Sequence, residues 1–235
     1  MKGIVYYTHN RCEERILQTC RNQLDCRGND FPIVSVSQFP IPWGENVVVD
    51  FEPSILSMFK QILIGLETIK TDIVFQCEHD VLYHPSHFDF TPPKKDVYYF
   101  NLNVWAVDAV SGQALYYDGM KMTSGLVAYR DILLEHYEKK IKWIEEVGKF
   151  SHNLMGYEPG KKTSKGRGYD YDWDTFRSEK PNIDIKHDLN ITRKRFEIKQ
   201  YKSRRLLYDS WSLADGVPHW GKTKGCFTKF LKEHY

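Results

Sequence analysis

The stretch that decides the fold is Thr71–Phe90, which reads TDIVFQCEHDVLYHPSHFDF. An apolar run, Ile73–Phe75, leads into an acidic triplet, Glu78-His79-Asp80. Because alternate residues of a strand point to the same face, the carboxylates of Glu78 and Asp80 are expected to converge where the strand ends. Two converging carboxylates suit a hard divalent cation such as Mn²⁺ or Mg²⁺. A cation at the carboxyl edge of a sheet can in turn hold the phosphates of a nucleotide.

The segment before this strand has the pattern of an amphipathic helix. Ser54 is a typical N-cap residue, and apolar side chains then recur at helical spacing. They are Ile55, Met58, Phe59, Ile62, Leu63, Leu66 and Ile69. Other acid-x-acid triplets occur, as at Asp50–Glu52, but only Glu78-His79-Asp80 follows a clear helix-then-strand unit. The unit therefore favours metal and phosphate binding over the simple solvation of a loop.

The rest of the chain alternates between strand and helix patterns. In chain order, the predicted elements are a strand at Ile4–Tyr7, a helix at Glu13–Cys26, strands at Phe31–Val36, Asp96–Val107 and Gln113–Tyr117, and a helix at Arg130–Val147. Strands that alternate with helices in the first 80 residues predict an α/β sandwich. The strands rich in Tyr and Val that follow predict that its sheet becomes mixed.

Together these segments resemble the nucleotide-sugar glycosyltransferases of the GT-A fold. In that family a helix, a strand and a DxD triplet follow one another, as LETIKTD, the next strand and EHD do here. The opening GIVYYTHNR is similar to the family's first strand and nucleotide-binding loop. The resemblance covers about the first 130 residues. It implies a GT-A-like (Rossmann-like) α/β/α sandwich with a mixed central sheet.

The resemblance also implies a donor site and a metal site. The donor is expected to be a nucleoside-diphosphate sugar, with UDP as the nucleotide, and the cofactor Mn²⁺ or Mg²⁺. The expected donor-site residues are Thr8, Asn10, Arg11, Glu78, His79 and Gly125. The expected metal ligands are Glu78, Asp80 and His187, the last at the end of a predicted strand. Glu78 stands where the family has Asp, so its longer side chain can reach the metal directly, through water, or contact the sugar instead.

A second acidic cluster offers candidates for the catalytic base. In inverting members of the family, an Asp or Glu ahead of a helix takes the proton from the acceptor hydroxyl. Thr175–Ser178 is predicted to begin such a helix, so Asp172 and Asp174 are the candidate bases. The alternative is that these carboxylates only cap the helix and solvate its start.

Three histidines near the triplet raise the question of zinc. They are His79, His84 and His87, but Pro85 interrupts any helix that would align the last two, and no cysteine joins them. The five cysteines of the chain include no CxxC pair, so neither a disulfide framework nor a cysteine zinc site is expected. Residues 83–88 are instead expected to form a loop close to the donor sugar.

The net charge of +2 conceals an asymmetry. Residues 1–138 carry 11 Lys/Arg and 18 Asp/Glu, a net charge of −7, whereas residues 139–235 carry 22 and 13, a net charge of +9. The basic residues of the second part include Lys161, Lys162, Lys165, Arg167, Arg193, Lys194, Arg195, Lys199, Lys202, Arg204 and Arg205. With the aromatic residues between them they predict a nucleic-acid surface. The alternatives are a solvated basic face and a face that counters the diphosphate of the donor.

The composition fits an enzyme, with 41% hydrophobic and 14% aromatic residues, and rules out a disordered chain. A single compact domain is expected, with a nucleotide-sugar-binding half at 1–110 and an acceptor-binding half at 111–235. No signal peptide and no membrane span are recognised, so a cytoplasmic location is expected, in the host if the protein is viral.

The acceptor is expected to be a hydroxyl group, and a hydroxymethylated pyrimidine of phage DNA is one candidate. An enzyme that acts on such a base has to pull it from the stack. Two other classes of function use the same residues. A metal-dependent phosphoesterase or nuclease would also need Glu78, Asp80 and a histidine, and a non-catalytic module would bind only a nucleotide.

Overall fold

The computed structural model describes residues 1–25, 31–119, 121–160, 170–191, 194–197, 200 and 211–234. The strands of its main sheet are β1 (Lys2–Thr8), β2 (Ile33–Ser37), β3 (Glu45–Val48), β4 (Ile73–Glu78), β6 (Val97–Asn101), β9 (Leu126–Tyr129) and β10 (Asp172–Phe176). A second sheet contains β5 (Val81–Leu82), β7 (Val104–Asp108), β8 (Ala114–Tyr116), β11 (Asn182–Lys186) and β12 (Ser212–Ala214). A short hairpin joins β13 (Gly216–Val217) to β14 (Gly221–Lys222).

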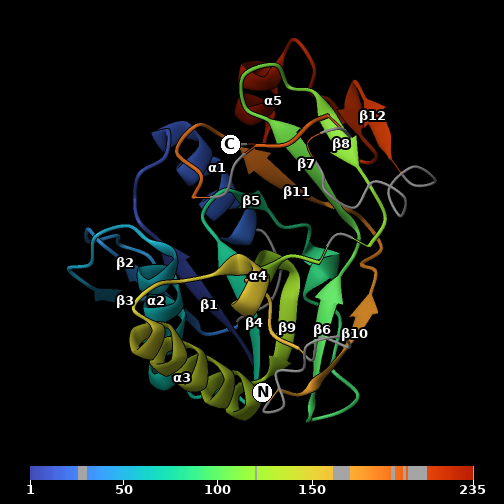
Figure 1. Cartoon of the computed structure of the whole chain (residues 1–235). Helices are drawn as coiled ribbons and strands as arrows, with labels where there is room; N and C mark the ends of the chain where they lie inside the picture. The colour runs from blue at the N-terminus through green and yellow to red at the C-terminus, as the bar shows by residue number, and fades with distance from the viewer. Residues whose placement is uncertain are drawn as a thin grey trace.

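The helices surround these sheets (Figure 1). They are α1 (Glu14–Asp25), α2 (Ile55–Thr68), α3 (Arg130–Val147), α4 (His152–Met155) and α5 (Phe227–Glu233), with 3-10 turns η1 (Pro85–His87) and η2 (Thr123–Gly125). The main sheet has the order β10-β6-β9-β4-β1-β2-β3. β1 runs parallel to β2 and β4, whereas β9 runs antiparallel to β4 and β6. The predicted α/β class with a mixed central sheet is therefore confirmed.

Two predicted elements are wrong in detail. The strand expected at Asp96–Val107 is two strands in different sheets, β6 and β7. The side chain of Asn101 accepts a hydrogen bond from the Asn103 N–H at 2.9 Å, which turns the backbone between them. The helix expected from Thr175 is strand β10, which pairs in parallel with β6. Its sequence, DWDTF, has the aromatic and β-branched residues that strands favour.

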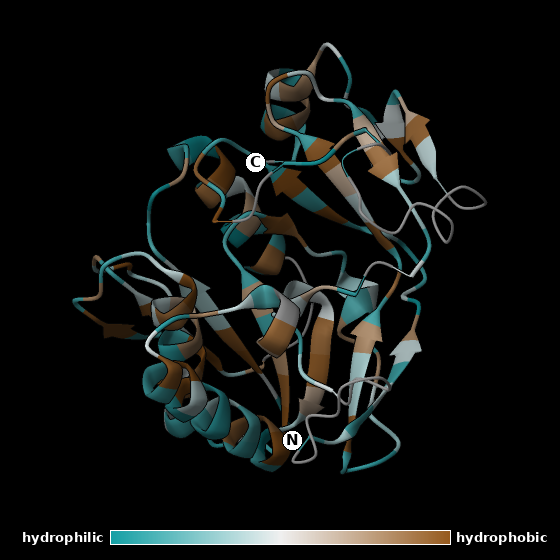
Figure 2. Cartoon of the chain, viewed as in Figure 1, coloured by the Kyte–Doolittle hydropathy of each residue, from teal (hydrophilic) through white to brown (hydrophobic). Residues whose placement is uncertain are grey.

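Both faces of the main sheet are buried. On β1, Val5 packs into the core beneath α2 and α3, and Ile4 packs into the core of the opposite face. α2 and α3 lie side by side over the first face (Figure 1). The second face is covered by Leu24 at the end of α1 and by Phe88 next to η1. Figure 2 shows the largely apolar strands, with apolar and polar stripes on the covering helices.

Helix α2 is fixed closely against β1. Its N-terminus has the predicted cap, because the Ser54 side chain accepts from the Ser57 N–H and the Ser57 side chain accepts from the Ser54 N–H. At Gly65 a Cβ atom would lie 2.5 Å from Cγ1 of Val5, so this position requires glycine for close packing. The Gln61 side chain donates to the Thr8 carbonyl at 2.9 Å. These contacts place the start of α2 beside the end of β1.

The two sheets meet at the carboxyl end of β4. After Glu78 the chain turns through His79 and Asp80 into β5, which pairs with β11 of the second sheet. The Ile185 N–H donates to the Asp80 carbonyl at 2.8 Å. The ends of β1, β4 and β11 therefore lie close together. Within the described residues, no helix is long and apolar enough to cross a membrane.

Candidate functional site

A pocket opens where β1, β4 and β11 end. Its walls come from these strand ends, the N-terminus of α2, η2, and the segment after α4. Polar residues that line it include Thr8, His9, Ser54, Ser57, Gln61, Glu78, His79, Asp80, Thr123, Ser124, Glu158, Asp184, Lys186 and Asn190. All three residues of the acidic triplet thus face one pocket.

Glu78 is held by an aromatic neighbour on the adjacent strand. Because β1 and β4 are parallel and in register, Tyr7 lies beside Glu78, and its hydroxyl donates to Oε1 at 2.6 Å. The Tyr83 hydroxyl accepts from the Glu78 N–H at 3.0 Å and donates to the Ser124 carbonyl at 2.9 Å, which ties the triplet to η2. Burial and the nearby charge of Asp80 raise the pKa of Glu78 to about 8.

Asp80 is buried and lies between two polar side chains of the loop after β11. Its Oδ2 accepts a short hydrogen bond from the Asn190 side chain and lies 3.3 Å from Nε2 of His187. Burial raises its pKa, but His79, His187 and Lys186 outweigh burial and hold that pKa well below its usual range. Its other oxygen, Oδ1, is buried with no hydrogen-bond partner among the described residues. The predicted approach of His187 to Asp80 is therefore present.

A third buried carboxylate, Asp184, faces the same pocket. Its Oδ2 lies 2.5 Å from Nζ of Lys186. Burial raises the pKa of Asp184, although Lys186 opposes this effect. Oδ1 of Asp184 is buried and, within the described ranges, has no hydrogen-bond partner. The sequence analysis missed both residues, although the alternation in NIDIK places positions 182, 184 and 186 on one face.

The pocket therefore contains more carboxyl groups than ammonium groups. Glu78, Asp80 and Asp184 face it together with Lys186, and two of the carboxylate oxygens are buried without a partner in the described part of the chain. Leaving such an atom unpaired costs about 1–3 kcal/mol, and more when it is charged. An oxygen-binding cation would satisfy these atoms.

Of the three donor-site residues predicted in the loop after β1, Thr8, Asn10 and Arg11, only Thr8 lines this pocket. Thr8 lines it and is buried. Asn10 has a positive φ of 59°, and its side chain accepts from the Gln38 and Phe39 N–H groups, so it ties this loop to the end of β2. The Arg11 side chain is mostly exposed, lies 3.9 Å from Glu52, and does not line the pocket.

Gly125 lies beneath the pocket rather than on its surface. Its neighbours Thr123 and Ser124 line the pocket, whereas a Cβ atom at Gly125 would come within 3.2 Å of the Asn101 carbonyl. Gly125 therefore packs closely against the end of β6. Its expected contact with the donor sugar stays a prediction.

The candidate bases do not reach the pocket. Asp172 and Asp174 are exposed on β10 at the edge of the main sheet, and neither lines the pocket. The cause is the strand that replaces the predicted helix, since it continues along β6. Glu158, a pocket-lining carboxylate, was not considered in the sequence analysis.

The three histidines near the triplet point to different places. The His84 ring packs against His219 at 4.7 Å between centroids. The buried His87 ring bonds to the Asn101 side chain at 3.0 Å. Only His79 lines the pocket. The structure thus does not bring these three rings together.

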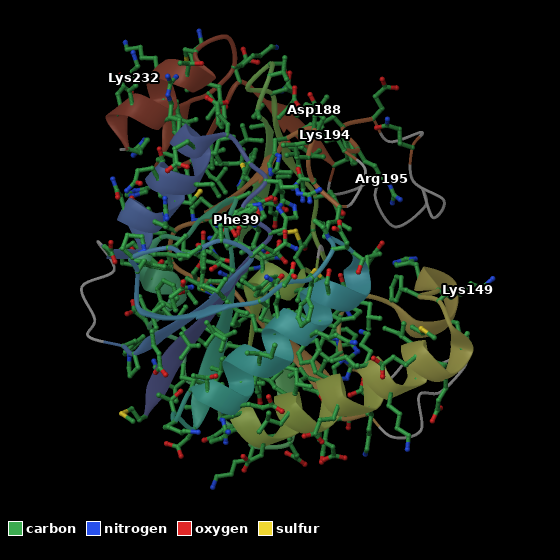
Figure 3. The ribbon with its side chains drawn as sticks, turned by 90° about the vertical axis from the view of Figure 1, so that its left-hand side faces the viewer. Phe39, Lys149, Asp188, Lys194, Arg195 and Lys232 are labelled. Atoms are coloured by element: carbon green, nitrogen blue, oxygen red, sulfur yellow. The ribbon has the colours of Figure 1, made fainter. Side chains whose placement is uncertain are left out.

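Nine of the eleven basic residues named for the predicted nucleic-acid surface lie outside the described residues. They are Lys161, Lys162, Lys165, Arg167, Arg193, Lys199, Lys202, Arg204 and Arg205. Lys194 and Arg195 are described (Figure 3). Lys194 pairs with Asp188 at 2.6 Å and with Asp108 at 3.2 Å, so its charge is balanced within the protein.

No protein-family profile matches the chain, and no curated protein matches it. The chain is similar to a solved glycosyltransferase involved in the glycosylation of the major capsid of PBCV-1, with a TM-score of 0.44 and 9% identity over 75% of this chain and 81% of that one. It is also similar to the glycosyltransferase GlyE of Streptococcus pneumoniae, with a TM-score of 0.37 and 15% identity over 62% of this chain and 39% of that one.

A third similar structure is the inositol-1-phosphate CTP transferase from T. maritima. The TM-score is 0.41, with 11% identity over 80% of this chain and 91% of that one.

Proposed function

We propose that the chain is a metal-dependent glycosyltransferase that uses a nucleoside-diphosphate sugar, with UDP as the expected nucleotide. The observation that carries this proposal is a group of three carboxyl side chains in one pocket, the half-buried Glu78 and the buried Asp80 and Asp184, where β1, β4 and β11 end. Ligands of open α/β sheets bind at this edge.

The residues of the pocket fit a hard divalent cation. Oδ1 of Asp80 and Oδ1 of Asp184 are buried oxygens without a hydrogen-bond partner in the described structure, and Mn²⁺ and Mg²⁺ prefer such oxygen ligands. We assign the cation to these carboxylates together with Glu78, and His187 is a further proposed ligand. A bound cation would neutralise the charge that develops on the departing nucleotide diphosphate.

The same pocket has groups that favour phosphate. Lys186 supplies a positive charge, and its pKa is raised because Asp184 and Asp80 outweigh the effect of burial. Ser54 and Ile55, at the N-terminus of the 14-residue helix α2, line the pocket as well. A helix N-terminus stabilises anions through its dipole and its N–H groups. Negative and positive groups side by side suit a metal–diphosphate unit better than either charge alone.

We propose Glu158 as the base for the acceptor hydroxyl, in place of Asp172 and Asp174. A general base must lie within hydrogen-bond reach of the reacting hydroxyl, and of these three carboxylates only Glu158 lines the pocket. We expect Glu158→Gln to lower turnover at least ~10-fold with unchanged donor affinity, because a base acts on the acceptor. Steady-state kinetics with varied donor would measure both. Asp172→Asn is the matched control, and a loss of turnover there with none in Glu158→Gln would return the role to β10.

The acceptor is proposed to be a hydroxyl group, with hydroxymethylated DNA as the first candidate. Its support is the net charge of +9 over residues 139–235. Lys194 lends little to this proposal, because Asp108 and Asp188 already neutralise it. Binding to DNA through phosphates would weaken steeply as the salt concentration rises.

One experiment tests donor and acceptor together. The purified chain is incubated with Mn²⁺ and a panel of UDP-, GDP- and dTDP-sugars, with and without duplex DNA that contains hydroxymethylcytosine. We expect slow hydrolysis of one donor without acceptor, and transfer of its labelled sugar to the DNA at low salt.

Other outcomes would point elsewhere. Hydrolysis of a donor without transfer to DNA would support the transferase and replace the acceptor by a small sugar, lipid or peptide hydroxyl. Cleavage of plasmid DNA would support a nuclease. If no donor turned over and no DNA were cut, a nucleotide-binding module would be the better description, and the proposal would fail.

A further inference from the structure

A group of nitrogen and sulfur ligands lies next to the carboxylates. Cys12 comes from the loop before α1, His79 follows β4, and His187 follows β11. One ligand atom from each of these side chains lies within 4.8 Å of the other two. The three residues are far apart in sequence, so the fold alone brings them together.

His79 supplies a buried imidazole nitrogen to this group. Its Nε2 is buried and, among the described residues, has no hydrogen-bond partner. A metal ion bound to the lone pair of this nitrogen would satisfy it. The residue as a whole is only 9% exposed.

His187 supplies a second buried imidazole. Its Nε2 also has no hydrogen-bond partner within the described ranges and lies 3.3 Å from Oδ2 of Asp80. Its Nδ1 accepts a long hydrogen bond, 3.3 Å, from the Leu189 N–H. Coordination through Nε2 requires the proton to lie on Nδ1, so this weak contact with Leu189 has to be released when a metal binds.

The donor set selects a class of metal. Two imidazoles and one thiolate are borderline-to-soft ligands that suit zinc and cobalt, whereas Mg²⁺ and Ca²⁺ prefer oxygen alone. Burial and the charge of Asp80 raise the pKa of the Cys12 thiol to about 12, so the thiol keeps its proton until a metal displaces it. The nearby ring of His9 is not included among the proposed ligands, because its Nδ1 already accepts a hydrogen bond from the Arg11 N–H at 2.9 Å.

We propose that Cys12, His79 and His187 bind a divalent ion of the zinc class. A bound ion would hold the loop after β1 against the ends of β4 and β11 and would so fix the position of the acidic triplet. The inference holds whether or not the chain transfers sugar. Because Nε2 of His187 can bind only one ion, this assignment replaces the role proposed above for His187 as a ligand of the hard cation, which keeps Glu78, Asp80 and Asp184.

Titration of the metal-free full chain with Co²⁺ tests the proposal, because a thiolate bound to cobalt gives a charge-transfer absorption in the near ultraviolet. We expect the parent to bind about one equivalent with this absorption and with the strong visible bands of a tetrahedral site. Cys12→Ser should lose the charge-transfer absorption. His79→Gln should weaken the affinity for Co²⁺ at least ~10-fold.

Matched variants separate this site from other ligands. Cys226→Ser and His219→Gln remove the same side-chain types at residues that neither line the pocket nor belong to the proposed metal group, and these variants should behave like the parent. Zn²⁺ should raise the melting temperature of the parent but not that of Cys12→Ser. The proposal is overturned if the parent shows no thiolate-to-cobalt absorption, or if Cys12→Ser keeps it. Asp80→Asn should keep it, which separates this site from a failure of the transferase proposal.

Discussion

Asp80→Asn is expected to lower sugar transfer at least ~100-fold, since charge stabilisation by a metal contributes several kcal/mol to the transition state. The substitution keeps the shape of the side chain but removes the charge that a hard cation requires. It also replaces one carboxylate oxygen by an amide nitrogen, at a group whose pKa is held low by its charged neighbours. Turnover should be measured across a range of Mn²⁺ concentrations.

The fold should survive this substitution, because Asp80 lies in the turn after β4 and not within a core strand. Circular dichroism would check this point. Asp89→Asn is the matched control, since that carboxylate is exposed just beyond η1, and it should retain parent activity. Near-parent turnover of Asp80→Asn at low Mn²⁺ would show that Asp80 does not hold the cation.

Much of the fold follows from local pattern. The helix at Arg130–Val147 matches α3 at both ends, and Ser54 is the cap of α2 as its sequence indicates. These elements are long and periodic, so burial and propensity agree. The helix expected to begin at Thr175 is part of strand β10, because so short a segment shows no clear hydrophobic periodicity. Its conformation is decided by its partner β6, which lies more than 70 residues earlier in the chain.

The part of the site that comes from one continuous stretch of sequence was predictable. Glu78 and Asp80 share a pocket because both stand at the end of one strand. Asp184 and Cys12 were missed, since their relation to the triplet comes from the pairing of β11 with β5 and from the path of the chain into α1. No local sequence pattern predicts that Cys12 lies close to the triplet. The alternation in NIDIK was the one available signal for Asp184.

Another buried carboxylate, that of Asp170, does not line the pocket and serves the fold. Oδ1 of Asp170 accepts from the Tyr98 hydroxyl at 2.9 Å and lies 3.2 Å from Nδ1 of His136, and Oδ2 accepts from the Gly160 N–H at 2.7 Å. Nζ of Lys140 lies 3.5 Å from Nε2 of the same His136 ring. Because an ammonium group only donates, the imidazole accepts there and donates from Nδ1 to Asp170. The His136 ring thus links a buried ammonium to a buried carboxylate.

This network sets an expected acid sensitivity. Burial alone raises the pKa of Asp170, but His136, the Gly160 N–H and Tyr98 outweigh burial and lower that pKa to about 2. A folded-state pKa below the unfolded value of 3.8 adds stability that is complete above pH 4 and is lost as the pH falls toward 2. The difference corresponds to about 2 kcal/mol, and the side chain is 1% exposed, so little of this is screened.

Asp170→Asn is therefore expected to lower the free energy of unfolding at pH 7 by about 3 kcal/mol, because it removes the buried carboxylate that accepts hydrogen bonds from Tyr98, His136 and Gly160. The variant should also lose the part of the acid dependence between pH 4 and 2 that Asp170 contributes. Chemical denaturation at several pH values would measure both effects. Glu138→Gln removes an exposed carboxylate from the same helix as His136 and should change stability by less than about 0.5 kcal/mol. Equal stability of Asp170→Asn and the parent at pH 7 would mean that the network stabilises nothing beyond what a neutral amide can replace.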